Sequence, residues 1–500
     1  MALPADRTPV IIGVGEFVDR PTDPAAALEP LALMEAAIRA ADADAGGSFL
    51  DRIDSLDVIN LVSWRYDRVA SRLAERLGIV PARASYGVAG GETPTTRIHE
   101  AALRIMNGNS LVAVVTGGEA TNAVAKAKAA GIALEWTPPA ASPENPIIAS
   151  DHVTPLAIRH GIAQPVHIYP LYENAAAAAW GQTPAEALAE SGQIWSGYAG
   201  VAATNPNSWS KTAFTADQIT TPTPDNRIIT WPYTKRMVAN PAVNQAAAVL
   251  LTNLELARAA GIPEDRIVYI HGGASAAEPM DYLARDQFTH SVAQDAVLAA
   301  ALRLAPEGGF DRRELYSCFP IVPKMARRQL GLDADAPFTV TGGLSFFGAP
   351  LNTYMTHAVC AMVRSLRKTP SKGALIYGQG GYVTKHHALV VGSFPPEPSS
   401  LVTPHDVQDE AEAMRGPIPE LDLMYEGEAR VETFAIVANR DGTPAYGSVI
   451  GRTPDGTRVF ARVAANDEDT LALLLDTTRS PIGTGGVVSV TDDGLQRWEA

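Results

Sequence analysis

Cysteine is scarce in this sequence: its 500 residues include only Cys318 and Cys360. Two thiols cannot form the several cross-links of a disulfide-stabilised secreted domain. They are also too few for a zinc site or an iron–sulfur cluster held by four thiolates. Other potential ligands show no short, fixed spacing, and no phosphate-binding loop of the Walker type is present, so we expect neither a metal nor a bound cofactor.

Long apolar runs and an excess of positive charge are also missing. No stretch approaches the roughly 18 uninterrupted apolar residues of a transmembrane helix, and residues 1–7 lack the apolar segment of a signal peptide. We therefore expect a cytoplasmic protein that does not insert into a membrane. Asp and Glu total 55 against 40 Lys and Arg, a formal charge of −15, which argues against a nucleic-acid partner.

Apolar residues are plentiful, at 46% of the chain, and the length predicts two to four domains. Strand-like runs alternate with amphipathic helical segments in two parts of the chain, which predicts an α/β fold. The strand-like runs are residues 9–15, 56–62, 111–116, 267–273, 374–377 and 388–391, and the main helical segments are 31–43, 68–77, 95–106, 293–304 and 352–366. We interpret the two α/β parts, residues 1–119 and 236–394, as an internal duplication.

The remaining segments differ in character. Residues 120–235 are rich in proline and aromatic residues, and such an insertion either shapes a substrate site or forms a structural cap. Residues 395–418 include a proline-rich stretch typical of a linker. Residues 419–500 alternate short β-runs with Asp-Gly turns, which predicts a small antiparallel β-barrel, similar to an OB-fold. Barrels of this size bind oligonucleotides, lipids or partner domains, so the barrel alone assigns no function.

Several motifs resemble those of thiolases, which are duplicated α/β proteins. Residues 342–350, Gly-Gly-Leu-Ser-Phe-Phe-Gly-Ala-Pro, are similar to the thiolase turn Gly-Gly-x-x-x-x-Gly-His-Pro. Residues 314–319 are similar to the His-Asp-Cys-Phe stretch of sterol-carrier-protein thiolases. Further likeness is found in residues 10–16, 111–119 and 240–251. The resemblance covers about residues 8–394 and implies a layered αβαβα fold, and the added barrel resembles the type 1 thiolase-like proteins, commonly labelled acetyl-CoA acetyltransferases.

The same resemblance shows what this chain lacks. Thiolases need a nucleophilic cysteine at a helix N-terminus, where the helix dipole and free N–H groups lower the pKa of the thiol. That position falls at Gly91 or Glu92, and the histidine of the Gly-His-Pro turn is replaced by Ala349. The acid/base cysteine is missing from residues 377–381, and the Asn or His that orients an oxyanion water aligns with Tyr316. These departures imply that acyl transfer through a cysteine is not available.

An insertion at residues 382–387 offers a replacement, because the resemblance places this hairpin beside the reacting thioester. We expect it to bring Lys385 and His386 to the pocket, with His386 as a general base and Lys385 polarising a carbonyl or holding a phosphate. The alternative is an exposed hairpin tip without a catalytic role. The glycines expected to approach a substrate carbonyl are Gly91, Gly343 and Gly381.

Five other candidates remain, and four of them have two interpretations each. Asn352 lies near the start of a helix that would offer an anion or carbonyl site, whereas His357 on that helix is more typical of a packed histidine than of a catalytic one. Cys318 is either a catalytic thiol or a small buried side chain, and Tyr316 either donates to an oxyanion or packs. Glu92 is either a base in the place of the nucleophile or a carboxylate stabilised by the helix dipole.

Two functions therefore stay open. The first is an acyltransferase-like enzyme that uses coenzyme A with an acyl-CoA or β-keto acid substrate. It would cleave or form a carbon–carbon bond next to the thioester without an acyl-cysteine. The second is a non-catalytic thiolase-like protein that binds acyl-CoA or lipid, or serves as a scaffold. Thiolases pair subunits through the core, and the appended barrel makes a monomer an alternative to a homodimer.

Overall fold

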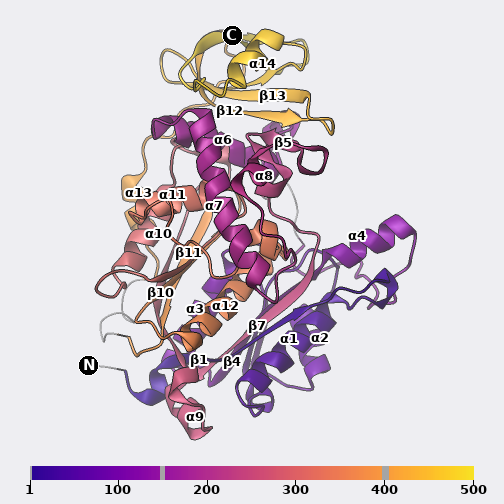
Figure 1. Cartoon of the computed structure of the whole chain (residues 1–500), viewed down its shortest axis with the longest axis vertical. Helices are drawn as coiled ribbons and strands as arrows, with labels where there is room; N and C mark the ends of the chain where they lie inside the picture. Colours follow the sequence, from indigo (N-terminus) through magenta and orange to yellow (C-terminus); the bar gives the residue numbers. More distant parts are fainter. Residues whose placement is uncertain (1–2, 147–152, 397–404) are drawn as a thin grey trace.

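The computed structural model describes residues 3–146, 153–396 and 405–500. Nine strands form one sheet in the order β3-β2-β4-β7-β1-β8-β11-β10-β9 (Figure 1). Their bounds are β1 (Pro9–Val18), β2 (Ser55–Val58), β3 (Arg83–Tyr86), β4 (Val112–Ala120), β7 (Asn244–Asn253), β8 (Val268–Ala277), β9 (Arg312–Leu315), β10 (Ala374–Gly380) and β11 (Lys385–Gly392). β4 and β7 are buried along their whole length, because helices cover both faces of these apolar strands.

The strand order repeats on either side of the centre of the sheet. From the centre outward, one half runs β1-β7-β4-β2-β3 and the other β8-β11-β10-β9. In each half the second strand is antiparallel to both neighbours, and the next two strands are parallel to each other. β1 and β8 meet through two antiparallel residue pairs, Val10 with Tyr269 and Ile11 with Val268. The predicted α/β fold with an internal duplication is confirmed.

Helices form three layers around the two half-sheets. α1 (Pro30–Asp44) and α2 (Val69–Leu77) pack against the first half, and α10 (Val292–Leu302) and α11 (Ile321–Gln329) against the second. α3 (Thr93–Met106) and α12 (Tyr354–Lys368) contact each other and strands of both halves, so they form the middle layer. The short α9 (Leu254–Ala259) follows β7. This is the αβαβα layering that the sequence predicted.

The region between the halves is largely helical. Its helices are α4 (Thr121–Ala130), α5 (Pro155–Arg159), α6 (Pro165–Ala179), α7 (Pro184–Thr204) and α8 (Ala216–Thr220). α4 projects from the body of the molecule, whereas α6 and α7 extend between the core and the C-terminal barrel (Figure 1). Two short strands, β5 (Ile228–Trp231) and β6 (Tyr233–Thr234), end this region, and β5 pairs with strand β12 of the barrel. The region therefore connects the two parts of the molecule.

The C-terminal residues form a closed five-stranded barrel. Its strands are β12 (Gly427–Ala438), β13 (Pro444–Arg452), β14 (Arg458–Val463), β15 (Gly485–Val490) and β16 (Gln496–Glu499). They pair in the order β12-β13-β14-β16-β15 and back to β12, with α14 (Glu468–Leu474) between β14 and β15, which is the arrangement of an OB-fold. The sequence predicted an antiparallel barrel, and one pair of strands differs from that prediction, because β14 and β16 run parallel. That parallel pair is possible because β15 and the α14 crossover separate the two strands in sequence.

Two connections have structures of their own. Residues 339–342 form no strand, because the carboxylate of Glu314 accepts the amides of Val340 and Thr341, which removes both donors from any ladder. The chain then makes a single π-helical turn, Gly343–Phe347, entered through two glycines with positive φ. Of the expected linker at 395–418, residues 397–404 lie outside the described residues, and Gln408–Met414 form α13.

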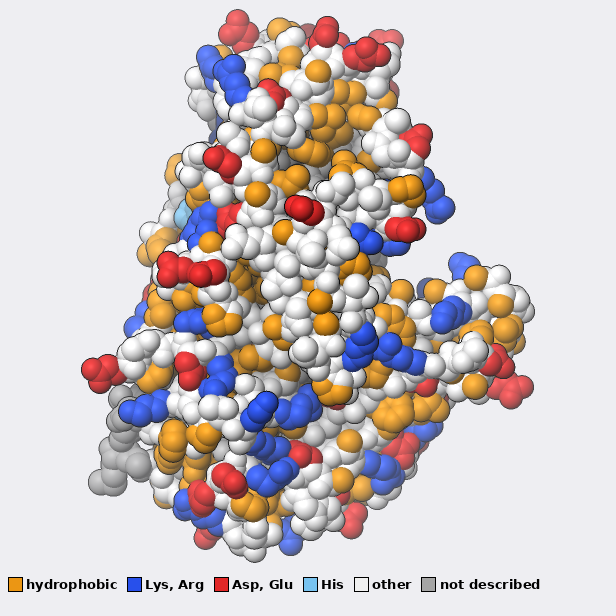
Figure 2. Space-filling view, viewed as in Figure 1, with side chains coloured by type: hydrophobic (Ala, Val, Ile, Leu, Met, Phe, Trp, Pro, Cys, Tyr) orange, Lys and Arg blue, Asp and Glu red, His pale blue; other side chains and the backbone are white. Residues whose placement is uncertain are grey.

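The surface carries both signs of charge. Lys and Arg side chains are interspersed with Asp and Glu over the face shown in Figure 2. Within the described parts of the chain, every helix is too short or too polar to cross a membrane.

Candidate functional site

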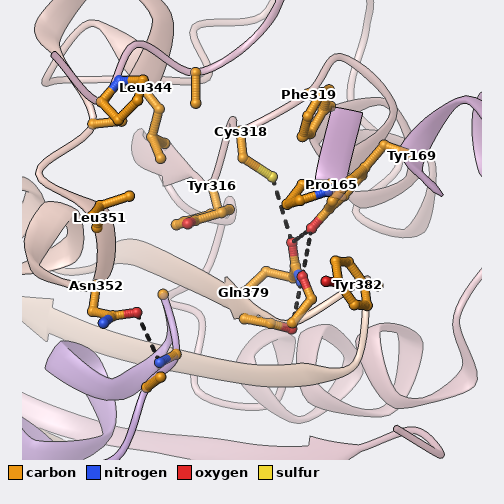
Figure 3. Close-up of a pocket in the computed structure, with 18 of the residues that line it drawn as sticks. Pro165, Tyr169, Tyr316, Cys318, Phe319, Leu344, Leu351, Asn352, Gln379 and Tyr382 are labelled. Atoms are coloured by element: carbon orange, nitrogen blue, oxygen red, sulfur yellow. Dashed lines mark hydrogen bonds between the residues drawn. The ribbon is translucent and has the colours of Figure 1, made fainter. Parts of the chain in front are cut away.

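A cavity of about 470 Å³ opens where the two halves, the inserted region and the N-terminus of α3 meet. Its walls are mainly apolar and aromatic (Figure 3). The lining residues are Val62, Ala89, Gly90, Gly91, Gln164, Pro165, Val166, Tyr169, Val238, Ala239, Pro241, Tyr316, Cys318, Phe319, Leu344, Ala349, Leu351, Asn352, Gln379, Gly380, Gly381, Tyr382 and Lys385. The volume suits a small organic ligand, and the apolar walls favour a hydrocarbon group.

The N-terminus of α3 forms one end of the cavity at Gly90 and Gly91. A Cβ atom on Gly91 would collide with the Tyr316 hydroxyl and with the backbone oxygen of Gln379. A hydroxyl on a side chain can move away, but the strand backbone at Gln379 cannot. Of the two positions that the resemblance assigns to a nucleophilic cysteine, Gly91 therefore has no room for a side chain, because the phenol of Tyr316 and the Gln379 backbone fill the space beside it.

Tyr316 and Cys318 follow β9 and both line the cavity. The Tyr316 hydroxyl forms no hydrogen bond with the residues that the structure describes, so it is free to donate to a ligand. The Cys318 Sγ lies 3.7 Å from Oε1 of Gln379, and burial raises the pKa of this thiol to about 12. Cys318 is therefore protonated at neutral pH, which makes it a poor nucleophile.

Two residues that the sequence did not single out as site residues, Tyr169 and Gln379, close one wall of the cavity. The Tyr169 hydroxyl on α6 lies 2.8 Å from Oε1 of Gln379 and 2.9 Å from the carbonyl oxygen of Gly381 (Figure 3). The only sequence signal for Tyr169 was the abundance of aromatic residues in the inserted region, and Gln379 lies inside the glycine turn. The inserted region thus lines the cavity, whichever of its two expected roles it performs.

Lys385 and Glu92 form an ion pair at the edge of the cavity. The Lys385 Nζ lies 3.2 Å from Oε1 of Glu92 and donates to the carbonyl oxygen of Ala89 at 2.6 Å. Burial raises the pKa of Glu92, and the charge of Lys385 opposes that shift. Oε2 of Glu92 is buried without a hydrogen-bond partner among the described residues. The structure thus places a cation on the wall and a carboxylate directly behind it.

His386 does not reach the cavity, and its expected role as general base at this site is corrected. Residues 385–387 belong to strand β11 rather than to a hairpin tip, and neighbouring residues of a strand point to opposite faces. Lys385 therefore faces α3, while the His386 ring bonds to the Tyr377 hydroxyl at 2.7 Å and to Ser291 Oγ at 3.2 Å. Burial lowers the pKa of His386 to about 4, so the ring is neutral.

His357 also lies away from the cavity. It is fully buried on α12, where Nδ1 lies 2.5 Å from Oε1 of Glu16, a carboxylate that also pairs with Arg364. Burial lowers the pKa of His357 to about 3, so the neutral ring donates its Nδ1 hydrogen to Glu16. This is the packed helical histidine that the sequence favoured over a catalytic one.

The other expected binding residues divide between the cavity and the core. Asn352 lines the cavity, and its Oδ1 accepts the amide of Gly90 at 3.0 Å, so its amide group fixes the loop before α3. Gly381 contributes its backbone to the wall. Gly343 is buried outside the cavity, and its amide donates to the Tyr354 hydroxyl at 3.1 Å. The expectation that Gly343 approaches a substrate carbonyl with a free N–H group is therefore wrong.

Substituting Gly91 by alanine is expected to destabilise the protein by about 1–3 kcal/mol, the usual cost of forcing an extra group into a packed site. Urea unfolding measures this loss. The matched control is Gly197→Ala in α7, where a Cβ would meet no described atom within 4 Å and alanine favours the helix by about 0.5–1 kcal/mol. Equal stability of the Gly91→Ala variant and the native protein would show that the site has room for a side chain.

Comparison with known proteins agrees with this geometry. A model of the thiolase-like protein type 1 additional C-terminal domain matches residues 406–495. The structure is similar to that of a monomeric SCP2-thiolase-like protein type 1 from Mycobacterium smegmatis, with 29% identity, 99% of both chains covered and a TM-score of 0.81. No curated protein sequence matches.

Two further solved structures match about four fifths of this chain. Human mitochondrial 3-ketoacyl-CoA thiolase in complex with CoA is 15% identical, with 79% of this chain and 99% of the other covered and a TM-score of 0.57. The Ltp2–ChsH2(DUF35) aldolase is 18% identical, with 78% and 98% covered and a TM-score of 0.58. The chain therefore has the layered thiolase fold, its residues 406–495 match the additional C-terminal domain of type 1 thiolase-like proteins, and over its whole length it is similar to a protein of that type.

Proposed function

We propose that the protein binds an acyl thioester of coenzyme A, with the acyl group in the cavity, and that no acyl group is transferred to a cysteine. The observation that carries this proposal is the collision at Gly91, where the Tyr316 hydroxyl and the Gln379 backbone exclude a nucleophilic side chain. A mainly apolar cavity of about 470 Å³ nevertheless lies beside this position. A cavity without a nucleophile favours binding over acyl transfer.

The surrounding groups support the same proposal. Cys318 carries a protonated thiol, because burial raises its pKa to about 12. His386 and His357 are both buried elsewhere, so neither can remove the proton of that thiol. The human thiolase with the same core fold was solved with CoA, which makes CoA thioesters the first ligands to test.

Calorimetric titration with CoA, acetyl-CoA and octanoyl-CoA tests the proposal. Octanoyl-CoA is expected to bind at least tenfold more tightly than acetyl-CoA, because each buried methylene contributes up to about 0.8 kcal/mol. Mass spectrometry after mixing with acetoacetyl-CoA is expected to show unmodified protein. Equal affinity for CoA and octanoyl-CoA, or an acyl adduct on Cys318, would contradict the proposal.

The Lys385–Glu92 pair favours a second, catalytic function. When CoA or water attacks the β-carbonyl of a β-keto thioester, an ammonium group on the cavity wall can stabilise the charge on the carbonyl oxygen, and the carboxylate beside it can accept the proton of the attacking group. The bond between the α- and β-carbons then breaks, and the α-carbon takes up that proton. A protein that shares the fold is the Ltp2–ChsH2(DUF35) aldolase. If acetoacetyl-CoA is turned over, Lys385→Met should abolish turnover while octanoyl-CoA still binds. Turnover that survives this substitution would exclude the pair from catalysis.

We further propose that the protein acts as a monomer in the cytoplasm with an acyl-CoA or β-keto acid as its ligand. The similar protein from Mycobacterium smegmatis is monomeric, which supports the first part. Light scattering at several protein concentrations measures the mass directly.

A further inference from the structure

The turn between β10 and β11, Gly381–Thr384, forms a wall of the cavity through Gly381 and Tyr382. Its backbone is unusual, because Gly381 has φ 65° and Val383, which carries a branched side chain, has φ 55°. A β-branched residue avoids the left-handed region unless its surroundings hold it there. The shape of this wall therefore depends on the groups that hold the turn.

Three of the four carbonyl oxygens in the turn accept hydrogen bonds from buried side chains. Gly381 accepts from the Tyr169 hydroxyl at 2.9 Å, and Tyr382 accepts from the Tyr172 hydroxyl at 3.1 Å. Both tyrosines belong to α6. Val383 accepts from Nη2 of Arg285 at 2.7 Å, and the same nitrogen lies 3.1 Å from the Tyr382 oxygen. Gln379 of β10 and His386 of β11 also lie within hydrogen-bond distance of the Gly381 and Val383 oxygens. The donors from outside this hairpin thus come from the inserted region and from one buried arginine.

Arg285 is in turn held by the barrel. Its own carbonyl oxygen accepts Nη1 of Arg458 at 2.6 Å, and the carbonyl oxygen of Leu283 accepts the same nitrogen at 2.7 Å. Arg458 lies on β14 with a fully buried side chain, and its guanidinium pairs with Glu432 of β12 at 2.7 Å. A continuous series of charged hydrogen bonds therefore runs from the barrel to the cavity wall.

The barrel also holds α6, the second source of donors. The Thr433 hydroxyl donates to the carbonyl oxygen of Leu171 at 2.5 Å, and Asn174 donates to the carbonyl oxygen of Phe434 at 2.9 Å. Both contacts join α6 to β12 (Figure 1). The barrel consequently acts on the turn by two routes, through Arg285 and through α6.

We infer that the C-terminal barrel positions the acyl-binding wall of the cavity, with Arg458 and Arg285 as positioning residues that never touch the ligand. This inference rests on the proposed binding of acyl-CoA for its functional consequence, but not for its structural part. The barrel then supports the ligand site of its own chain and need not bind a ligand itself. Its strands β13 and β14 also contact the inserted region: the Phe460 ring stacks on His160 with centroids 4.0 Å apart, and the Tyr446 hydroxyl donates to the carbonyl oxygen of Gly161 at 2.9 Å.

The experiment compares the native protein with Arg458→Met, Arg458→Lys and the control Arg497→Met. Lysine keeps a cation beside Glu432 but cannot reach the carbonyl oxygens of both Leu283 and Arg285. It therefore tests the contact with Arg285 while the charge next to Glu432 is kept. Arg497 lies on β16 and pairs with Glu499 and Asp467, all within the barrel. Hydrogen–deuterium exchange of residues 381–385 measures how firmly the turn is held. Calorimetry with octanoyl-CoA and with CoA measures whether the wall still binds the acyl group.

Exchange in the turn is expected to rise at least tenfold in Arg458→Met, less in Arg458→Lys and not in Arg497→Met. Affinity for octanoyl-CoA should fall about tenfold in Arg458→Met with affinity for CoA unchanged, because only the acyl group contacts the turn. Exchange in both Arg458 variants equal to that of the control would overturn the inference. If the native protein fails to bind octanoyl-CoA, the proposed function fails, and the exchange result still decides whether the barrel positions the turn.

Discussion

Replacing Lys324 by methionine is expected to destabilise the protein by about 3–5 kcal/mol, the usual result of removing one partner from a buried ion pair. The Lys324 ammonium lies 2.5 Å from Oε1 of Glu173, and both side chains are almost fully buried. It also donates to the Ala187 carbonyl oxygen at 2.9 Å and to Ser191 Oγ at 3.1 Å. Methionine fills much of the same volume but leaves the carboxylate of Glu173 without a cation.

The location of this pair explains the size of the effect. Lys324 lies on α11 of the second half, whereas its partners lie on α6 and α7 of the inserted region. Oε2 of Glu173 also accepts the Tyr233 hydroxyl at 2.8 Å, which connects the pair to the strands that lead to the barrel. The pair therefore holds the inserted region against the core.

Urea unfolding followed by circular dichroism measures the loss. The double variant Lys324→Met with Glu173→Gln should recover part of the stability, because no uncompensated charge then remains buried. Arg258→Met is the surface control: its pair with Glu264 is exposed and screened by water, so stability should change little. A Lys324→Met protein as stable as the control would contradict the assigned role.

The buried histidine His99 is expected to make the folded protein less stable as the pH falls. Its ring on α3 lies 3.1 Å, nitrogen to nitrogen, from His387, and packs against the ring of His405. Burial, with a smaller effect of His405, lowers the pKa of His99 to about 3. The unfolded chain has a histidine pKa near 6.5, so between pH 6.5 and 3 the unfolded state binds the extra proton and stability falls with pH.

The magnitude follows from the difference in protonation. At pH 5 the native protein should have lost about 2 kcal/mol through His99 relative to pH 7. Other buried groups titrate in the same range, and several carboxyls act in the opposite direction. The measured quantity is therefore the difference in unfolding free energy between the native protein and His99→Gln, determined at both pH values.

That difference should shrink by about 2 kcal/mol on acidification. His290 offers a control of opposite sign, because its bond to Asp295 raises the pKa of this partly exposed ring. A raised pKa gives stability that is present below pH 6.5, so the difference for His290→Gln should grow on acidification. A pH-independent difference for His99→Gln would show that the ring can be protonated without cost in the folded state.

The fold was largely accessible from the sequence because its signals are local. The apolar runs that became β1, β4 and β8 and the helices between them have the periods of strands and helices, and their order repeats along the chain. The Asp-Gly turns marked the hairpins of the barrel. The glycine turn at 342–350 and the lack of a cysteine near Gly91 led to the superfamily and to an altered site, because both depend only on residue type and order.

What the sequence by itself determined was thus the layered, duplicated α/β architecture, the added barrel and the region of the chain that forms the site. Only the tertiary structure decided which side chains face the cavity. A one-residue step along β11 separates Lys385, on the wall, from His386, in the core, and no sequence pattern fixes that choice between faces. The filling of the space beside Gly91 by Tyr316, and the barrel's hold on Arg285, likewise join residues more than 170 positions apart. Such contacts arise from packing between layers, which depends on the whole fold and not on neighbouring residues.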